Sequence, residues 1–430
     1  MLTTPESRPV NKLGGIKAYC VCFASALFFF YEFIQMQMFN AINESLRDVF
    51  TSSATDLSFL SSTYLWGDLL FLLPAGVLLD RYSTRKIIIY AMLMCIVSTF
   101  GFAMTSDIKM AGFWHFMAGT GNAFCFLACV ILVARWFPSN KQAMLIGMVI
   151  TIAFLGGMAA QAPLASLSAY IGWRKALWCV GVMGIFILMV IVKFVEDTPS
   201  AYVYSKPNAQ TSVFSELKQV IKNKQNHLAG LYTSLLNLPI MVLCALWGTA
   251  AVKSLHGVSD LQASTIVSMI FVGSIIGCPV AGWLSDNMGF RRKPMIWGAV
   301  LSLITMSILM VNHPLSFSVL IMLFFCLGFF SSTQVIAYPM VAESNKHQLT
   351  ATATGLASLI IMCGGAVGQL LFGKLLDWHW QGSLLNGARS YLAGDYHYAM
   401  MLFPLAFGIA LCAVLLTKET YCTQSTEALS

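Results

Sequence analysis

Two carboxylic acids stand in long apolar stretches of this sequence, where an ionised side chain is costly. Of the 18 Asp and Glu residues, only Glu32 and Asp68 fall well inside such stretches. Acids in this setting usually face a binding partner or a water-filled cavity. Either carboxylate could hold the ammonium group of a substrate or exchange a proton. A protonated acid, or a buried hydrogen bond between helices, is the structural alternative.

Aromatic and imidazole side chains accompany these acids at helical spacing. Tyr64 and Asp68 are four residues apart, as are Tyr31 and Gln35, so each pair would share one face of a helix. His115 is the one histidine clearly inside an apolar stretch. Its imidazole could shuttle protons near neutral pH, or it could be a hydrogen-bonded structural histidine.

Uncharged polar side chains form the rest of the predicted binding site. Gln161 and Gln369 occupy matching positions in the two halves of the sequence, Gln334 and Tyr338 share one helical face, and Asn237 lies in a similar apolar run. Amides and phenols suit a zwitterionic or polyhydroxylated solute. Hydrogen bonding between helices is the alternative for each of them. As a set around a midplane cavity, they favour solute binding.

The elements that carry these side chains are predicted to be membrane-spanning helices. The 430 residues are 58% hydrophobic and 10% charged, whereas soluble proteins have about 25% charged residues. A span needs about 20 apolar residues. The apolar runs therefore predict an all-α membrane protein of twelve helices, near 17–40, 57–79, 86–105, 111–134, 143–167, 174–195, 227–252, 260–284, 294–312, 315–341, 349–376 and 397–417.

Lys and Arg residues lie between the apolar runs and indicate the orientation. With the N-terminus in the cytoplasm, 18 of the 25 Lys and Arg residues fall on the cytoplasmic side and 7 on the other, as the positive-inside rule requires. Both termini are therefore expected in the cytoplasm. The same placement argues against nucleic-acid binding, despite the net charge of +7. The predicted organisation is a tail, a six-helix bundle, a cytoplasmic linker, a second six-helix bundle and a tail, at 1–16, 17–195, 196–226, 227–417 and 418–430.

The two halves of the sequence repeat each other. The segment Gly76–Lys86 resembles Gly282–Arg292 at an offset of 206 residues. Three ordered matches at a nearly constant offset indicate duplication. Two parallel six-helix halves are an architecture that transporters use, with the solute held near the midplane between them. The other two matches, at offsets of 205 and 208, are Ser139–Lys141 with Ser344–Lys346 and Gly156–Gln161 with Gly364–Gln369.

The repeated pattern Gly-x-Leu-x-Asp-Arg-x-Gly-x-Arg resembles the cytoplasmic signature of the major facilitator superfamily, and the resemblance covers nearly the whole chain. It implies that the glycine lets two helices approach, that the Asp caps a helix end, and that the Arg residues bind acidic or carbonyl groups. In that family the motif latches the two halves on the cytoplasmic side. Ser83 departs from the pattern's Gly, and Asn287 from its Arg. The resemblance assigns the latch to Gly76, Asp80, Arg81, Arg85, Gly282, Asp286, Gly289 and Arg291.

A narrower resemblance concerns the substrate. The run Phe28–Phe33, with Tyr64 and the ending Trp380…Tyr391…Tyr396, is similar to a branch that includes bacterial intraphagosomal amino-acid transporters and the animal lysosomal dipeptide transporter. It implies alternating-access transport of a small polar organic solute, as a facilitator or a proton symporter. Efflux of drugs or metabolites by proton antiport is the alternative, although the fifth span lacks the Gly-x-x-x-Gly-Pro-x-x-Gly-Gly order of exporters.

The expected partners are the lipid bilayer, a small-molecule substrate and, for a symporter, protons. A monomer in a bacterial inner membrane is expected. No nucleophile–base arrangement, metal-ligand spacing or phosphate-binding glycine loop stands in the sequence. Enzymatic activity, cofactors and bound metals are therefore not expected.

Overall fold

The computed structural model describes residues 15–50, 53–137, 139–198, 213–311, 315–346, 349–385 and 388–423. These residues form helices that run side by side, and a short hairpin of two antiparallel strands. The predicted all-α class is confirmed. The predicted tail at 1–16 and much of the linker at 196–226 lie outside the described residues.

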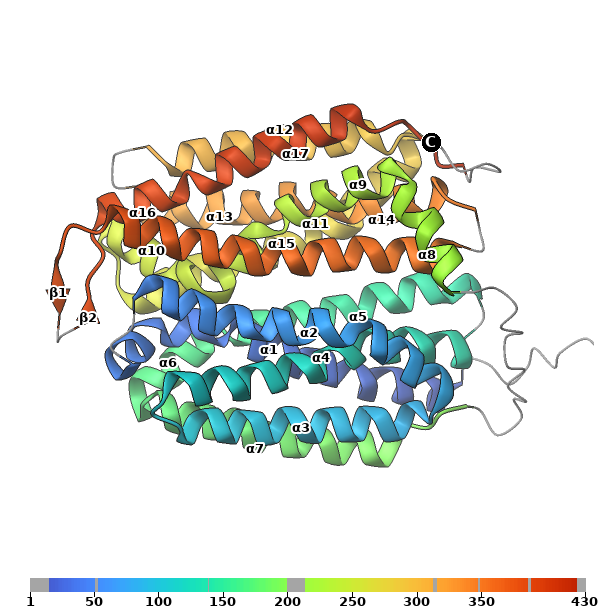
Figure 1. The fold of residues 1–430 in the computed structure, drawn as a ribbon, viewed down its shortest axis with the longest axis horizontal. Coiled ribbons are helices and arrows are strands. Elements are labelled where there is room, and N and C mark those ends of the chain that lie inside the picture. The colour runs from blue at the N-terminus through green and yellow to red at the C-terminus, as the bar shows by residue number, and fades with distance from the viewer. Residues whose placement is uncertain are drawn as a thin grey trace, which may run out of the picture.

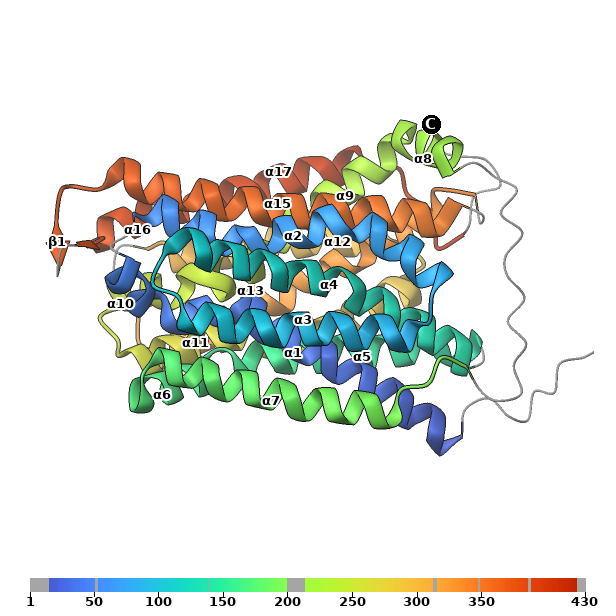
Figure 2. The same ribbon diagram turned by 60° about the horizontal axis from the view of Figure 1, so that its bottom comes forward.

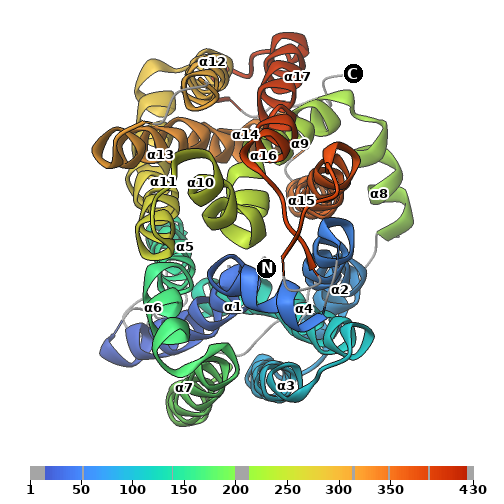
Figure 3. The ribbon, with the colours of Figure 1, turned by 90° about the vertical axis from the view of Figure 1, so that its left-hand side faces the viewer.

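The first helical bundle is formed by the N-terminal half of the chain (Figure 3). Each predicted span of this half corresponds to one long helix, except the fifth, which consists of two. The helices are α1 (Ile16–Phe50), α2 (Ala54–Arg81), α3 (Thr84–Met104), α4 (Ile108–Trp136), α5 (Ser139–Ala159), α6 (Ala162–Ile171) and α7 (Trp173–Phe194).

The second bundle is formed by the C-terminal half, and three of its spans are interrupted. The short helix α8, which stands within the predicted linker, lies next to α9 (Figure 2). The elements are α8 (Val213–Lys222), α9 (Lys224–Leu236), the π-helix η2 (Pro239–Trp247), α10 (Gly248–His256), α11 (Asp260–Met288), α12 (Arg292–Leu309), α13 (Phe317–Ser331), the 3-10 helix η3 (Ser332–Ile336), α14 (Ala337–Glu343), α15 (Thr350–His379), β1 (Leu384–Leu385), β2 (Ala388–Arg389), α16 (Ala393–Met400) and α17 (Leu402–Leu416).

Ten helical stretches in the described part of the chain are long and apolar enough to cross a membrane. The two remaining long helices, α2 and α12, run alongside these ten in the same bundles (Figure 1). α2 carries Asp56 and Asp68, and α12 starts with Arg292 and Lys293, which lowers the mean hydropathy of both. Together these helices correspond to the twelve predicted spans.

The two halves pack their equivalent helices in the same way. A Cβ atom at Gly119 of α4 would overlap the carbonyl oxygen of Tyr64 in α2, and a Cβ at Gly328 of α13 would overlap that of Ile270 in α11. Only glycine allows backbones to approach this closely, as in other membrane helix pairs. The equivalent contacts support the duplication inferred from the sequence.

The two ends of the molecule differ. We call the end that carries β1 and β2 the hairpin end, and the opposite end, where α1 begins and α17 ends, the terminal end (Figure 1). Seen from the hairpin end, the segment between α15 and α16 reaches from the second bundle toward α1 and α2 of the first (Figure 3). Contacts between the bundles at this end define the candidate site.

Candidate functional site: the seam between the two bundles

Amide side chains of the first bundle bind the backbone of η2 and α10 across the seam. The amide of Gln161 donates to the carbonyl of Cys244 at 2.9 Å, and that of Asn43 donates to the carbonyl of Leu246 at 2.7 Å. Asn40 donates to the Gln161 side chain at 2.5 Å and accepts from the backbone N–H of Thr249 at 2.8 Å. These buried bonds hold the two bundles together toward the hairpin end.

The π-helix η2 explains why these carbonyls can accept side-chain bonds. A π-helix departs from the regular bonding of an α-helix and is often found at functional sites. Gln369, in α15 of the same bundle, also donates to this segment, to the carbonyl of Met241 at 2.7 Å. The two matched glutamines of the sequence therefore both bind η2, one from each bundle.

The carboxylate of Asp377 joins the two bundles at the hairpin end, and we call its set of bonds the clasp. Asp377 of α15 accepts hydrogen bonds from the backbone N–H groups of Ala54 and Thr55, at 3.3 and 2.8 Å, which begin α2 in the other bundle. An anion at the first turn of a helix is favoured by the helix dipole and satisfies free N–H groups. Asp377 also accepts from Arg389 at 2.9 Å and from the hydroxyl of Tyr391 at 2.5 Å.

Arg47 of α1 reaches the hairpin and extends this clasp. Its guanidinium donates to the carbonyl of Arg389 and lies 4.9 Å from the ring centre of Tyr391. The indole of Trp247 donates to the hydroxyl of Ser58 in α2 at 2.9 Å. The hairpin end is therefore closed by polar bonds that join the bundles at several points.

Glu32 and Asp68, the two acids predicted within spans, are both buried in the first bundle. The hydroxyl of Tyr64 donates to the Glu32 carboxylate at 2.6 Å. Among the described residues, neither acid has a Lys, Arg or His within ion-pair distance. The other Glu32 oxygen, Oε1, has no hydrogen-bond partner there. This carboxyl group can accept a further bond or a proton.

Further polar atoms on α1 and α15 are buried without partners in the described part of the protein. Both polar atoms of the Gln37 amide are in this state, as are Oε1 of Gln35 and Oε1 of Gln369. Leaving a buried polar atom unpaired costs about 1–3 kcal/mol. Such atoms mark places where water or a solute can be bound.

Tyr31 and Gln35 share a face of α1, as their spacing predicts, but this face points into their own bundle. The Tyr31 hydroxyl lies 2.9 Å from the hydroxyl of Thr99, and the Gln35 amide donates to Thr99 and to the carbonyl of Cys95. These bonds tie α1 to α3. The geometry favours a structural role for both residues.

His115 lies in an aromatic box within the first bundle. Its ring stacks on Phe39 at a centroid distance of 4.3 Å, and Tyr64 and Phe102 lie at 5.2 and 5.9 Å. His115 is 2% exposed, and aromatic rings form its described surroundings. The arrangement favours the structural alternative over a proton shuttle.

The candidate residues of the second bundle fall into two groups. Gln334, in the 3-10 segment η3, donates to the side chain of Asn237 at 3.1 Å, where α9 ends. Both residues therefore lie at helix interruptions. Tyr338 of α14 is more exposed, at 37%, than the other candidates. It lies beside Ser358 of α15.

The described side chains of the first-half gating motif bind within their own bundle. The hydroxyl of Ser83 donates to Asp197 at 2.5 Å, and the backbone N–H of Arg85 donates to the same carboxylate at 2.8 Å. The Arg85 guanidinium donates to the carbonyl of Val192 at 2.6 Å. Arg85 thus binds a carbonyl, as the motif implies, but in α7 of the same bundle. The side chains of Asp80 and Arg81 lie outside the described part of the structure.

Two contacts that the motif implies are not seen among the described residues. In the described part of the chain, a Cβ at Gly76 or Gly282 would meet no heavy atom within 4 Å, so neither glycine makes a close helix contact there. The physical reason is that the described polar bonds between the bundles lie at the hairpin end. Asp286 does not cap α11 either: Gly289, with a φ of 66°, caps it through the N–H bond to the Asp286 carbonyl.

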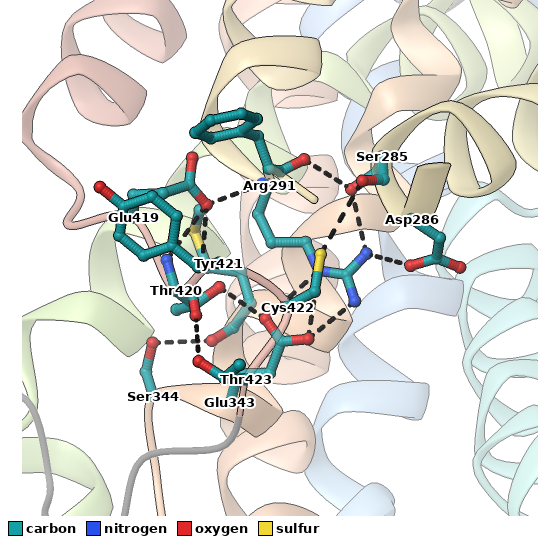
Figure 4. A network of polar contacts seen from close by, with 12 residues as sticks. Ser285, Asp286, Arg291, Glu343, Ser344, Glu419, Thr420, Tyr421, Cys422 and Thr423 are labelled. Carbon is teal, nitrogen blue, oxygen red and sulfur yellow. Dashed lines mark hydrogen bonds and ion pairs between the residues drawn. The ribbon is translucent and has the colours of Figure 1, made fainter. Parts of the chain in front are cut away.

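Arg291 is the centre of the motif in the second half (Figure 4). Its guanidinium donates to Asp286 at 2.5 Å and to Glu343 at 2.7 Å. The positive charge of Arg291 thereby offsets the negative charge of Asp286 in the last turn of α11, where the helix dipole disfavours an anion. Like Arg85, Arg291 binds within its own bundle.

The segment after α17 binds the same corner. Glu419 accepts from the backbone N–H groups of Arg291 and Arg292, at 2.7 and 2.9 Å, and so caps the start of α12. The hydroxyl of Thr420 donates to Glu343 at 2.5 Å. Figure 4 shows this segment lying over Arg291. The predicted C-terminal tail is therefore in part a structural element of the motif.

Replacing Glu419 by Gln is expected to loosen the first turn of α12. The amide has one oxygen where the carboxylate offers two, so its NH₂ group would face a backbone N–H. The loss of a charged cap costs about 1–2 kcal/mol, which predicts roughly tenfold faster hydrogen exchange at Arg291 and Arg292. Mass spectrometry of exchange in detergent measures this. Glu196→Gln is the control, since Glu196 forms an exposed ion pair with Lys17; equal exchange in both variants would contradict the cap.

Sequence reasoning missed the seam residues on α1 and the clasp at Asp377. A signal for the first was present, because Gln37, Asn40 and Asn43 are spaced by three residues and form a polar stripe within an apolar run. Asp377 gave no local signal. Its partners Ala54 and Thr55 are more than 300 residues away in the chain.

Comparison with known proteins identifies the class. A family model described as the Major Facilitator Superfamily matches residues 21–252 and 248–421. The chain is similar to a bacterial homologue of the human lysosomal transporter Spinster, solved inward-facing and unoccupied, with a TM-score of 0.78 and 14% identity over 98% of this chain and 100% of that one. A mutant of the nucleoside transporter NupG gives a TM-score of 0.73 and 12% identity over 92% and 99%.

Curated relatives are similar over most of their length. The membrane sensor protein UhpC of Escherichia coli (strain K12) is 26% identical over 391 residues, which are 83% of this chain and 85% of that protein. The probable galactarate/D-glucarate transporter GarP of the same strain is 22% identical over 369 residues, 76% and 80% of the two chains. The family match and the apolar helices define an integral, multi-pass membrane transporter. The chain belongs to the Major Facilitator Superfamily.

Proposed function

We propose that this transporter carries a small polar solute with an ammonium group, of the amino-acid or dipeptide class, by alternating access and with proton coupling through Glu32. One observation carries the proposal. Two buried carboxylic acids, Glu32 and Asp68, lie in the first bundle without a cationic partner among the described residues. A buried acid of this kind accepts either a proton or the cationic group of a ligand.

The unpaired amides support a zwitterionic solute. Gln37 and Gln369 have buried polar atoms without partners in the described part of the chain. An amide can donate to a carboxylate without the cost of burying a second charge. Solute carboxylate and ammonium groups would thus find partners of different kinds. We place Glu32, Gln37, Asp68 and Gln369 at the site, with Asn237, Gln334 and Tyr338 as further candidates.

The names of relatives favour a second candidate, an organic anion. GarP is named a galactarate/D-glucarate transporter, and a protein of Chlamydia pneumoniae that is 22% identical is named a probable hexose phosphate transport protein. Sites for such anions rely on Arg or Lys. In the described spans of this chain, each Lys and Arg lies within two turns of a helix end. This distribution favours the ammonium solute.

We infer the orientation and location from the distribution of charge. The 18 to 7 bias of Lys and Arg places the terminal end in the cytoplasm. The hairpin end then faces outward, and the described arrangement, with bonds between bundles at the hairpin end, is closed to the outside. A bacterial inner membrane and a monomeric state fit the bacterial relatives and the single seam.

Uptake into proteoliposomes tests the substrate class. With an inward proton gradient, labelled amino acids or dipeptides are expected to accumulate, while glucose 6-phosphate and glucarate are not. Accumulation of the two anions alone would overturn the ammonium assignment in favour of the second candidate. Equal uptake of an amino acid with and without the gradient would retain the substrate and remove proton coupling.

A further inference from the structure

A cavity of about 430 Å³ opens at the hairpin end of the second bundle, away from the seam. It lies where α10, α12, α15 and α16 end or begin, and the bundle seam residues do not line it. Its size is that of sites for small molecules. The lining combines aliphatic side chains with imidazole and phenol groups: Leu255, His256, Leu309, Val311, His379, Ala393, Gly394, His397, Tyr398 and Met401.

Three of the seven histidines of the chain line this one cavity. His379 is oriented by Asp395: its Nδ1 lies 2.8 Å from a carboxylate oxygen, and its ring stacks on Tyr398 at a centroid distance of 5.1 Å. A carboxylate partner places the proton of a neutral ring on Nδ1. Protonated His379 would then present Nε2–H as a second donor.

His256 is fixed differently. The backbone N–H of Leu315 lies 3.3 Å from its Nδ1. Because Nδ1 is the acceptor in this bond, the neutral ring carries its proton on Nε2 and is a donor without being charged. His397 and Tyr398, on α16, add an imidazole and a hydroxyl to the same lining. The cavity is thus lined by several imidazole and phenol groups that can donate hydrogen bonds.

Other charges around the cavity are already paired. Lys253, one turn before His256 on α10, forms ion pairs with Glu44 and with Asp260 at the start of α11. On α15, Asp377 is held by Arg389 and by the first turn of α2. On α16, Asp395 is bound by His379 and by the N–H of Leu392. The lining that α12 contributes is apolar.

We propose that this cavity is a second binding site, for the carboxylate, sulfate or phosphate group of a small anion, with the imidazoles of His256, His379 and His397 as ligands. The site is separate from the transport seam, and the proposal does not depend on which solute crosses the membrane. A metal ion is a poorer fit, since no group of three or more His, Cys, Asp or Glu in the described residues has the geometry to hold one. Imidazole groups become cationic as the pH falls, so binding of an anion is expected to be stronger in acid.

Sulfate is the probe of choice because its charge does not change between pH 5.5 and 7.5. Isothermal titration calorimetry on the full chain in detergent, at constant ionic strength, is expected to give saturable sulfate binding at pH 5.5. The affinity should fall about tenfold or more at pH 7.5, since each lost charge-assisted bond is worth about a factor of ten. Replacing His256 and His397 together by Gln should have a similar effect at pH 5.5.

His227→Gln is the matched control, because His227 lies on α9 at the terminal end. Folding of each variant is checked by its thermal unfolding, so a misfolded protein is not counted. No binding by folded wild type at pH 5.5, or equal binding in the double variant, would overturn the site. Nanodiscs distinguish the source of the anion: sulfate binding lost with phosphatidylglycerol but kept with phosphatidylcholine assigns the site to a lipid headgroup, and binding in both assigns it to a free solute.

Discussion

Replacing Glu32 by Gln is expected to abolish concentrative uptake. The amide keeps an oxygen that can accept the hydrogen bond from Tyr64, now 2.6 Å from the carboxylate, so the packing should survive. It can no longer gain and lose a proton. A symporter that moves one proton per solute can accumulate it about tenfold for each pH unit of gradient. In the variant, the ratio of internal to external solute should fall to about one.

Proteoliposome uptake and counterflow together check this result. Loss of gradient-driven uptake with retained solute exchange would assign Glu32 to proton coupling, and loss of both would assign it to solute binding. Asp48→Asn is a matched control on the same helix, since Asp48 is exposed. Unchanged uptake with an unchanged pH dependence in Glu32→Gln would remove Glu32 from the mechanism.

Replacing Asp377 by Asn is expected to open the hairpin end. The carboxylate accepts bonds from the first turn of α2, from Arg389 and from Tyr391. Bonds to a charged partner contribute about 1.5–3 kcal/mol each, and the neutral amide weakens all of them at once. If one such bond is lost from the closed conformer and the open conformer is unaffected, the ratio of open to closed conformers rises by about 10- to 100-fold.

The accessibility of a seam residue measures this shift. Ser58, buried against Trp247, is replaced by Cys and labelled with an impermeant maleimide, with mass spectrometry resolving its peptide from those of the native cysteines. Labelling should be faster in Asp377→Asn than in Asp260→Asn, whose carboxylate is 61% exposed and forms one ion pair, with Lys253. Equal labelling rates would mean that the clasp does not hold this end closed.

The bonds that close the seam lie near the proposed binding site. At the hairpin end, amides of Asn40, Asn43 and Gln161 bind η2 and α10. Asn40 and Asn43 lie one to two turns along α1 from Gln37, and Gln161 stands at the start of α6. Gln369 donates to Met241 of η2, so a solute bound by Gln369 would compete with the helix segment that closes the seam. This proximity is a physical route by which binding could bias the conformer ratio.

The sequence alone determined the membrane class, the spans, the internal repeat and the presence of two acids inside spans. These properties are local or additive: a run of about 20 apolar residues stays in lipid whatever its neighbours are. Hence the predicted spans correspond to helices that begin and end within a few residues, except where α1 extends to Phe50. The repeat is likewise visible in the residues themselves, at Gly76–Lys86 and Gly282–Arg292.

Tertiary structure decided which faces meet. Helical spacing shows that Tyr31 and Gln35 share a face, but the direction of that face depends on how α1 is rotated in its bundle. The contacts turn it toward Thr99 and turn Asn40 toward Thr249. The bonds from α2 to Asp377 and the closure of the hairpin end also depend on tertiary packing. One sequence adopts both conformers of a transporter, so the sequence pattern does not show which conformer forms.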